Sequence, residues 1–174
     1  MEGAHKTDPA TYAMLRRHSL ETRLSRIAPR AIQAVLMDFH VDHGTVTVVA
    51  CVDGSASLYL SSGGGFLGGS QHYPAIREAA LHAVGLATTM QCHFEPTETS
   101  ALPPLGDVTF YVTTGQGVLM AVASQARLRA AADPLAGLGG AMQRIVTEYR
   151  ICFPKRPSAA VQPPVEPAHE SSAL

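Results

Sequence analysis

A glycine-rich segment near the middle of the chain holds the residues best suited to close contact with another molecule. Five glycines fall within seven residues, and the candidate binding site is Gly63, Gly64, Gly65, Phe66, Leu67, Gly68, Gly69 and Ser70. Glycine has no Cβ, so such a segment tolerates positive φ and lets a ligand or partner approach the main chain. If the segment leads from a strand into a helix, its backbone N–H groups could bind an anion such as phosphate.

The segment lacks the cation that phosphate-binding loops use. It does not match G-x-x-x-x-G-K-[ST], and no Lys or Arg lies between Ser55 and Ile76, which leaves Arg77 as the nearest candidate. The alternatives are a tight structural loop, a bulged strand end, or a flat surface contacted by another chain. Phe66 and Leu67 favour the surface, because an apolar pair between glycines can anchor an interface. We therefore rank a structural loop or a protein contact ahead of an anion site.

A second cluster, Asp38-Phe39-His40-Val41-Asp42-His43, carries groups that bind metals. Asp38, His40 and Asp42 alternate along an expected strand and would share one face. With His43, these carboxylates and imidazoles would suit Zn²⁺ or another divalent cation. More distant ligands would come from His72, His82, Cys92 and His93. The alternative is a solvated strand face followed by a polar turn. We prefer it because the chain has no H-E-x-x-H motif, and we predict neither a metal nor a cofactor.

Nucleophilic catalysis has little support in the sequence. The chain has no G-x-S-x-G motif, and its three cysteines, Cys51, Cys92 and Cys152, lie far apart. Cys92 and His93 are adjacent, but catalytic pairs usually come from separate segments of a chain. We therefore predict no catalytic residue and favour a protein that is not an enzyme.

Turn and helix signals divide the chain into elements. Asp8-Pro9 is typical of a helix start, with Asp as the N-cap and Pro at the first helical position. Asp53-Gly54 is typical of the turn in a β-hairpin. Hydrophobic periodicity predicts the remaining boundaries. We expect helices over residues 9–28, 74–90 and 133–151, strands over 32–41, 45–52, 57–62, 107–114 and 118–124, and a loop over 91–106.

These elements occur in the order α-β-β-β-α-β-β-α, with hairpin-length turns between neighbouring strands. We therefore predict an α+β fold with a mostly antiparallel five-stranded sheet and helices mainly on one face. A single domain is expected over residues 9–152. Residues 1–8 and the Pro-rich tail 153–174 are predicted to be disordered, the tail because it cannot bury enough apolar surface.

Composition narrows the function classes further. The chain has 174 residues, of which 46% are hydrophobic and 16% charged, and its net charge of -1 argues against nucleic-acid binding. The sequence contains no signal-peptide core and no apolar run long enough to span a membrane, so we expect a cytoplasmic protein without membrane contact. The first helix is basic. It could bind a membrane surface or an acidic partner, but we prefer a helix that packs on the sheet with a solvated basic face.

Two resemblances accompany this prediction. The segment D-G-S-A-S-L-Y-L-S-S-G-G-G-F-L-G-G resembles a family of uncharacterised bacterial proteins that share D-G-x-x-S-L-Y-x-S-x-G-G-G-x-x-G-G, and it implies no activity. The element order over residues 9–151 resembles that of secretion-chaperone-like domains and, more loosely, roadblock/longin-like domains. This second resemblance is one of topology, without a shared sequence motif.

The leading hypothesis is a non-catalytic cytoplasmic binding protein that acts through protein–protein contacts, chaperone-like or regulatory, and forms a homodimer. Its contacts would come from Phe66, Leu67 and the surrounding glycines. On this hypothesis, Phe66→Asp weakens self-association or partner capture and leaves the fold intact. The alternative is a sensor or enzyme that binds a phosphate-bearing small ligand at Gly63–Gly69.

Overall fold

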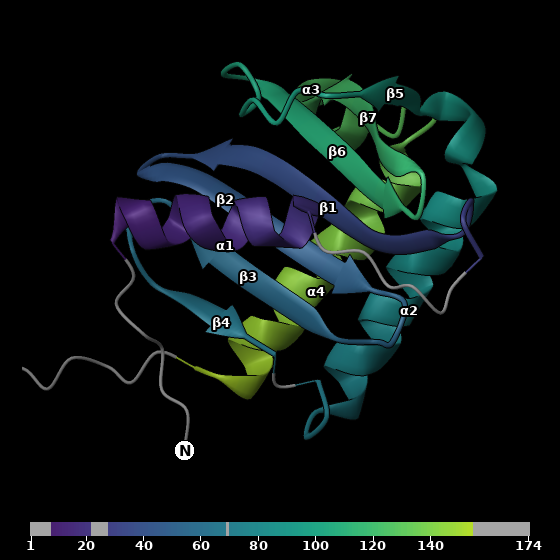
Figure 1. The fold of residues 1–174 in the computed structure, drawn as a ribbon. Helices are drawn as coiled ribbons and strands as arrows, with labels where there is room; N and C mark the ends of the chain where they lie inside the picture. The colour runs from purple at the N-terminus through teal and green to yellow at the C-terminus, as the bar shows by residue number, and fades with distance from the viewer. Residues whose placement is uncertain (1–7, 22–27, 69, 155–174) are drawn as a thin grey trace, which may run out of the picture.

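Seven strands form one antiparallel sheet in the computed structural model, which describes residues 8–21, 28–68 and 70–154 (Figure 1). Their order across the sheet is β4-β3-β2-β1-β6-β7-β5. The strands are β1 (Ile32–Val41), β2 (Gly44–Cys51), β3 (Ala56–Leu60), β4 (Gly65–Leu67), β5 (Glu95–Thr97), β6 (Asp107–Thr114) and β7 (Gly117–Ser124). The long strands β1 and β6 are therefore central, and the short strands β4 and β5 form the two edges.

Helices cover both faces of this sheet. Figure 1 shows α1 (Pro9–Glu21) on the near face, and α2 (Pro74–Thr89) with α4 (Ala136–Cys152) behind the sheet. Two short helical segments, η1 (Gln91–His93) and α3 (Gln125–Arg129), complete the described elements. The prediction that helices lie mainly on one face thus holds for α2 and α4, whereas α1 packs on the opposite face.

The side chains of β1 alternate between two hydrophobic clusters. Val35 and Met37 belong to the main core, which lies between the sheet and the helices α2 and α4. Leu36 belongs to a smaller cluster under α1, together with Tyr12 and Leu20 of that helix. Since strand side chains alternate between faces, Asp38 also lies on the α1 side. The α1 side is thus the more polar face of this strand.

The prediction of five strands is wrong, because the sheet also contains β4 and β5. Each has three residues, too few for a hydrophobic period to be visible. β4 begins with a glycine, and β5 contains Pro96, which is tolerated on an edge strand because no further strand needs its missing N–H group. The observed order α-β-β-β-β-α-β-β-β-α-α therefore differs from the predicted one.

The local predictions were more accurate. Asp8 accepts a hydrogen bond from the Thr11 backbone N–H at 2.7 Å, as expected of an N-cap. The hairpin at Asp53-Gly54 is present, and Gly54 has a φ of 81°. The last predicted helix begins later than expected, at Ala136, because Asp133 accepts a hydrogen bond from the Leu135 N–H in a turn before it. Residues 1–7 and 155–174 of the predicted disordered ends lie outside the described residues. So do residues 22–27 of the predicted first helix.

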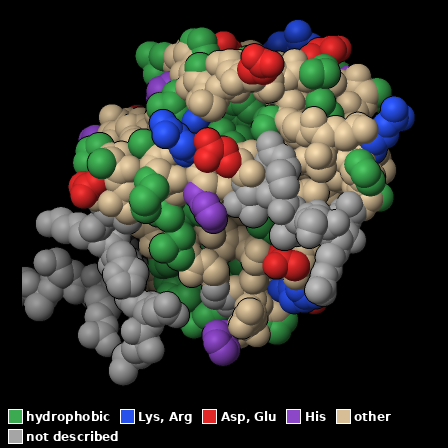
Figure 2. All heavy atoms as spheres, viewed as in Figure 1, with side chains coloured by type: hydrophobic (Ala, Val, Ile, Leu, Met, Phe, Trp, Pro, Cys, Tyr) green, Lys and Arg blue, Asp and Glu red, His purple; other side chains and the backbone are tan. Residues whose placement is uncertain are grey.

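Figure 2 shows the α1 side with acidic and basic side chains scattered over it rather than gathered into one patch. None of the helices in the described residues combines the length and apolar character needed to cross a membrane.

Candidate functional site

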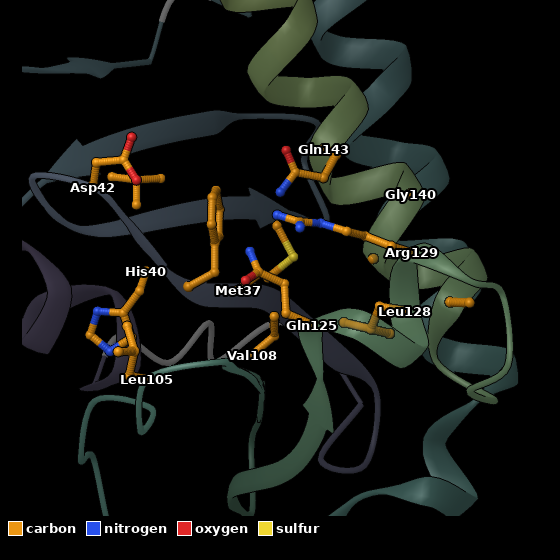
Figure 3. A pocket seen from close by; sticks show the side chains of 14 residues that line it. Met37, His40, Asp42, Leu105, Val108, Gln125, Leu128, Arg129, Gly140 and Gln143 are labelled. Atoms are coloured by element: carbon orange, nitrogen blue, oxygen red, sulfur yellow. The ribbon is translucent and has the colours of Figure 1, made fainter.

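An open groove of about 730 Å³ lies on the side of the sheet that α2 and α4 cover (Figure 3). Its floor is apolar and comes mainly from β1, β6 and α3 through Met37, Phe39, Val108 and Leu128. This volume lies within the range of about 300–1,000 Å³ that is typical of ligand sites. The floor residues belong to the main core or pack against it, so a rigid part of the fold supports the groove.

Polar side chains stand at opposite sides of the groove. Figure 3 shows Arg129 of α3 and Gln143 of α4 extending toward the same part of it, while Asp42 lies across from them at the β1–β2 turn. All three side chains are exposed. Arg129 takes part in none of the ion pairs among the described residues. A ligand in the groove would therefore meet a cation at one side and a carboxylate at the other.

Two glycines of α4 keep the groove open. A Cβ at Gly140 would meet no atom within 4 Å, and a Cβ at Gly139 would meet Leu128 and Phe110 at 3.6 Å. A larger residue at position 140 would project into the open groove, whereas one at position 139 would press on Leu128 and Phe110. Glycine inside a helix is unfavourable relative to alanine, so the pair is a sequence signal. This pair was missed in the sequence because the candidate site was sought among the glycines at 63–69.

A strained residue ends α3 next to the groove. Ala131 has a φ of 52°, the left-handed region that residues with a Cβ rarely adopt. The turn is held by Arg127, which donates a hydrogen bond to the Ala132 carbonyl at 3.0 Å and lies 3.7 Å from Asp133. These contacts turn Arg127 toward residues 132 and 133, whereas Arg129 faces the groove. Backbone strain often occurs near functional positions.

The predicted glycine site does not form a turn directly between a strand and a helix. Gly63 and Gly64, with φ values of 97° and 90°, form the turn of the β3–β4 hairpin. Gly65 begins the edge strand, and a Cβ there would come within 2.5 Å of the Leu58 carbonyl oxygen. Gly68 follows the strand, Ser70 is buried, and Gly69 lies outside the described residues. The described glycines in this segment thus serve the backbone geometry of the hairpin and of the strand that follows.

The polar groups near this segment are directed inward. The Gly63 N–H donates to the Leu60 carbonyl at 3.0 Å, and the Ile76 N–H at the start of α2 donates to Tyr73. Arg77, the candidate phosphate-binding cation, donates a hydrogen bond to the Asp53 carbonyl. These contacts give no support to an anion cradle at Gly63–Gly69.

Phe66 is part of an aromatic cluster. Its ring stacks on Tyr149 of α4 with a centroid distance of 5.1 Å, and it lies 5.0 Å from the ring of Phe153. Phe153, which the prediction assigned to the tail, also contacts Tyr73 at 4.9 Å. Leu67 on the same short strand is 52% exposed. Of the predicted apolar pair, only Leu67 is therefore a surface residue.

Tyr149 links this cluster to the backbone and makes the fold sensitive to alkali. Its hydroxyl oxygen lies 2.6 Å from the Ala56 carbonyl and 2.5 Å from the Gly68 carbonyl, and its single proton is shared between these two acceptors. Burial raises the pKa of Tyr149 far above its usual value of 10.0. The folded chain therefore keeps this proton where the unfolded chain loses it, and stability must fall as the pH rises above 10.0.

We expect urea unfolding across that pH range to show a decline of up to about 1.4 kcal/mol per pH unit for each such tyrosine. Burial raises the pKa values of Tyr12 and Tyr111 as well, so Tyr149→Phe should flatten the decline in part. An equally steep decline in Tyr149→Phe would show that this hydroxyl is not responsible.

The candidate metal ligands do not come together, and the preferred alternative, a solvated strand face, is wrong for Asp38. Asp38 has no exposed surface, and its Oδ2 accepts hydrogen bonds from Arg16 Nε at 2.9 Å and Nη2 at 2.6 Å. His40 Nε2 lies 2.7 Å from the Pro103 carbonyl oxygen, while Asp42 and His43 are exposed. Across the described residues, no three His, Cys, Asp or Glu side chains are grouped so that they could hold a metal ion.

Asp38 instead takes part in a buried ion pair with Arg16. Burial alone would lower the pKa of Arg16, but its hydrogen bond to Asp38 and the charge of that carboxylate leave the pKa raised. Thr47 donates a hydrogen bond to Asp38 Oδ1 at 2.5 Å, so both carboxylate oxygens are engaged. Cys51 offers no better nucleophile, since burial raises the pKa of its thiol.

Comparisons of the chain with known proteins found no relative that informs this site. No protein family, no curated protein and no solved structure matches the chain. The resemblances drawn from the glycine segment and from the order of elements therefore remain predictions.

Proposed function

We propose that this chain is a non-catalytic binding protein, which captures a short segment of a partner protein in the groove beside Arg129. The observation that carries the proposal is an apolar floor bounded by opposite charges, Arg129 at one side and Asp42 at the other. A peptide in extended form can place apolar side chains on such a floor and charged ones at its ends. The expected partner segment carries an acidic residue near Arg129.

The shape of the groove favours a peptide over an enclosed small molecule. Its rim includes Leu105, which is 88% exposed, and Val41, which is 44% exposed. Exposed apolar residues that border an apolar groove commonly mark sites of protein contact. The proposal retains the function class expected from the sequence, a protein that binds other proteins. It moves the contact from the glycine segment to the groove, and self-association remains a separate prediction.

The test fills the groove without disturbing the fold. Gly140→Leu adds a side chain where a Cβ meets no atom within 4 Å, and Gly85→Leu on α2 is the matched control, since the same holds there. Both variants should be at least as stable as the original chain, because glycine inside a helix costs about 0.5–1 kcal/mol relative to alanine. A phage library of random short peptides provides the probe.

We expect selected peptides to combine apolar and acidic residues and to bind the Gly85→Leu chain unchanged. Their affinity for Gly140→Leu should fall at least about tenfold, which corresponds to 1.4 kcal/mol. Arg129→Glu should reverse the charge preference in a second selection. Peptides that bind Gly140→Leu and Gly85→Leu equally well would refute the groove as the binding site.

A further inference from the structure

The guanidinium group of Arg16 occupies a well-formed socket on the α1 side of the sheet, away from the groove. Arg16 is 6% exposed, and its Nε and Nη2 atoms bond Asp38 as described above. Its Nη1 donates a hydrogen bond to the Ser100 carbonyl at 2.6 Å. The guanidinium carbon Cζ lies 5.4 Å from the centre of the Tyr111 ring. A carboxylate, backbone carbonyls and an aromatic face together are the groups that select arginine over lysine.

Every group that forms this socket lies outside α1. Asp38 is on β1, Tyr111 is on β6, and the carbonyl comes from the segment before β6. Thr47 of β2 fixes the second carboxylate oxygen, and the Tyr111 hydroxyl donates to the Ala101 carbonyl at 2.6 Å. The groups that contact the guanidinium therefore come from the sheet and its loop, while α1 supplies the arginine and the Tyr12 hydroxyl, which lies 2.9 Å from Thr47 Oγ1.

Besides Arg16, α1 is attached through the Tyr12 hydroxyl, hydrogen-bonded to Thr47 at 2.9 Å, and through the Ser19 hydroxyl, 3.3 Å from that of Tyr59. Only Tyr12, Arg16 and Leu20 of its residues are buried. Tyr12 and Leu20 belong to the small cluster under α1. This cluster is separate from the main core between the sheet and the helices α2 and α4. Elements with few buried apolar contacts open locally while the rest of a protein stays folded. Release of α1 would leave the main core in place.

The sheet also has a polar group that α1 does not satisfy. Thr113 Oγ1 is the only buried side-chain N or O atom in the described part of the chain that has no hydrogen-bond partner. It lines a cavity of about 250 Å³ between the sheet and α1, where His18 and Ser19 form part of the wall. Buried polar groups are nearly always hydrogen-bonded, so α1 is an incomplete match for this face.

We propose that this socket is an arginine-recognition site, which α1 occupies within the free chain and which an arginine-bearing helix of a partner protein takes over. The partner's arginine replaces Arg16 on Asp38 and the Ser100 carbonyl. A polar side chain two or three residues further along the partner's helix, at the level of His18 and Ser19 of α1, reaches the Thr113 hydroxyl. The proposal is independent of the groove, because the two sites lie on opposite faces of the sheet.

The test uses the full chain and a labelled synthetic peptide with the sequence of residues 8–21. Arg16→Ala removes the internal competitor, and Arg17→Ala on the same helix is the control, because Arg17 is exposed. By fluorescence anisotropy, we expect the peptide to bind the Arg16→Ala chain at least about tenfold more tightly than the Arg17→Ala chain. A peptide with Arg16→Lys should bind about tenfold more weakly than the arginine peptide.

Two results would overturn the proposal. One is equal affinity of the folded Arg16→Ala chain for the arginine peptide and for a peptide with Arg16→Ala. The other would come from hydrogen–deuterium exchange on the original chain. Here we expect the amides of α1 to exchange faster than those of α4, and to lose further protection when excess peptide is added. Amides of α1 that stay as protected as those of α4 would rule out exchange. If Arg16→Ala does not fold, the Arg16→Lys chain replaces it in the binding assay.

Discussion

Replacing Arg16 by alanine should lower the free energy of unfolding by about 3–5 kcal/mol. The change leaves the carboxylate of Asp38 buried, with the Thr47 hydroxyl as its remaining side-chain donor in the described structure. The Ser100 carbonyl also loses its hydrogen bond from Nη1. Removing one member of a buried ion pair is costly because the other keeps its charge without compensation. Urea unfolding followed by circular dichroism measures the change.

The controls separate this charge effect from simple loss of a side chain. Arg17→Ala removes an exposed arginine from the same helix and should alter stability by no more than about 0.5 kcal/mol. Replacing both members, Arg16→Met with Asp38→Leu, should recover most of the loss, because an apolar pair of similar volume has no charge to desolvate. If Arg16→Ala costs no more than Arg17→Ala, the ion pair does not hold α1 on the sheet.

Local signals in the sequence were sufficient for much of the fold. The hairpin turn at Asp53-Gly54 and the N-cap at Asp8 depend on residues that are neighbours in the chain, and both were predicted. The buried face of α2, which includes Ile76, Ala80 and Ala83, follows from helical spacing alone. The edge strands were missed because three residues carry no period, and because β4 consists of a glycine and two apolar residues that pair with β3 only in the folded chain.

The sites depend on contacts between distant segments, so the sequence revealed them only in part. Alternation assigned Asp38 and His40 to one strand face, but it did not reveal that Asp38 is buried. Arg16 and the Ser100 carbonyl come from remote parts of the chain, and they turn a candidate metal ligand into half of an ion pair. The groove likewise needs β1, α3 and α4 together, and only its paired glycines, Gly139 and Gly140, could have signalled it beforehand.

The second large effect is expected at Phe66, where the structure leads to a different expectation from the sequence. An exposed Phe66 would tolerate aspartate, but this ring is half-buried, stacks on Tyr149 and packs against the main core. A carboxylate in its place would face the rings of Tyr149 and Phe153 without an ionic partner among the side chains it contacts. We expect Phe66→Asp to lower the free energy of unfolding by about 2–4 kcal/mol, through lost packing and a partly desolvated charge.

Leu67→Asp is the matched control, one residue further along the same edge strand. Leu67 is 52% exposed, so the same substitution there should change stability by no more than about 0.5 kcal/mol. Thermal and urea unfolding of both variants gives the comparison, and equal losses would contradict the packing of Phe66 against α4. The pair also decides how self-association should be tested. A change in oligomeric mass is informative for Leu67→Asp, whose fold should persist, whereas for Phe66→Asp it would be confounded by unfolding.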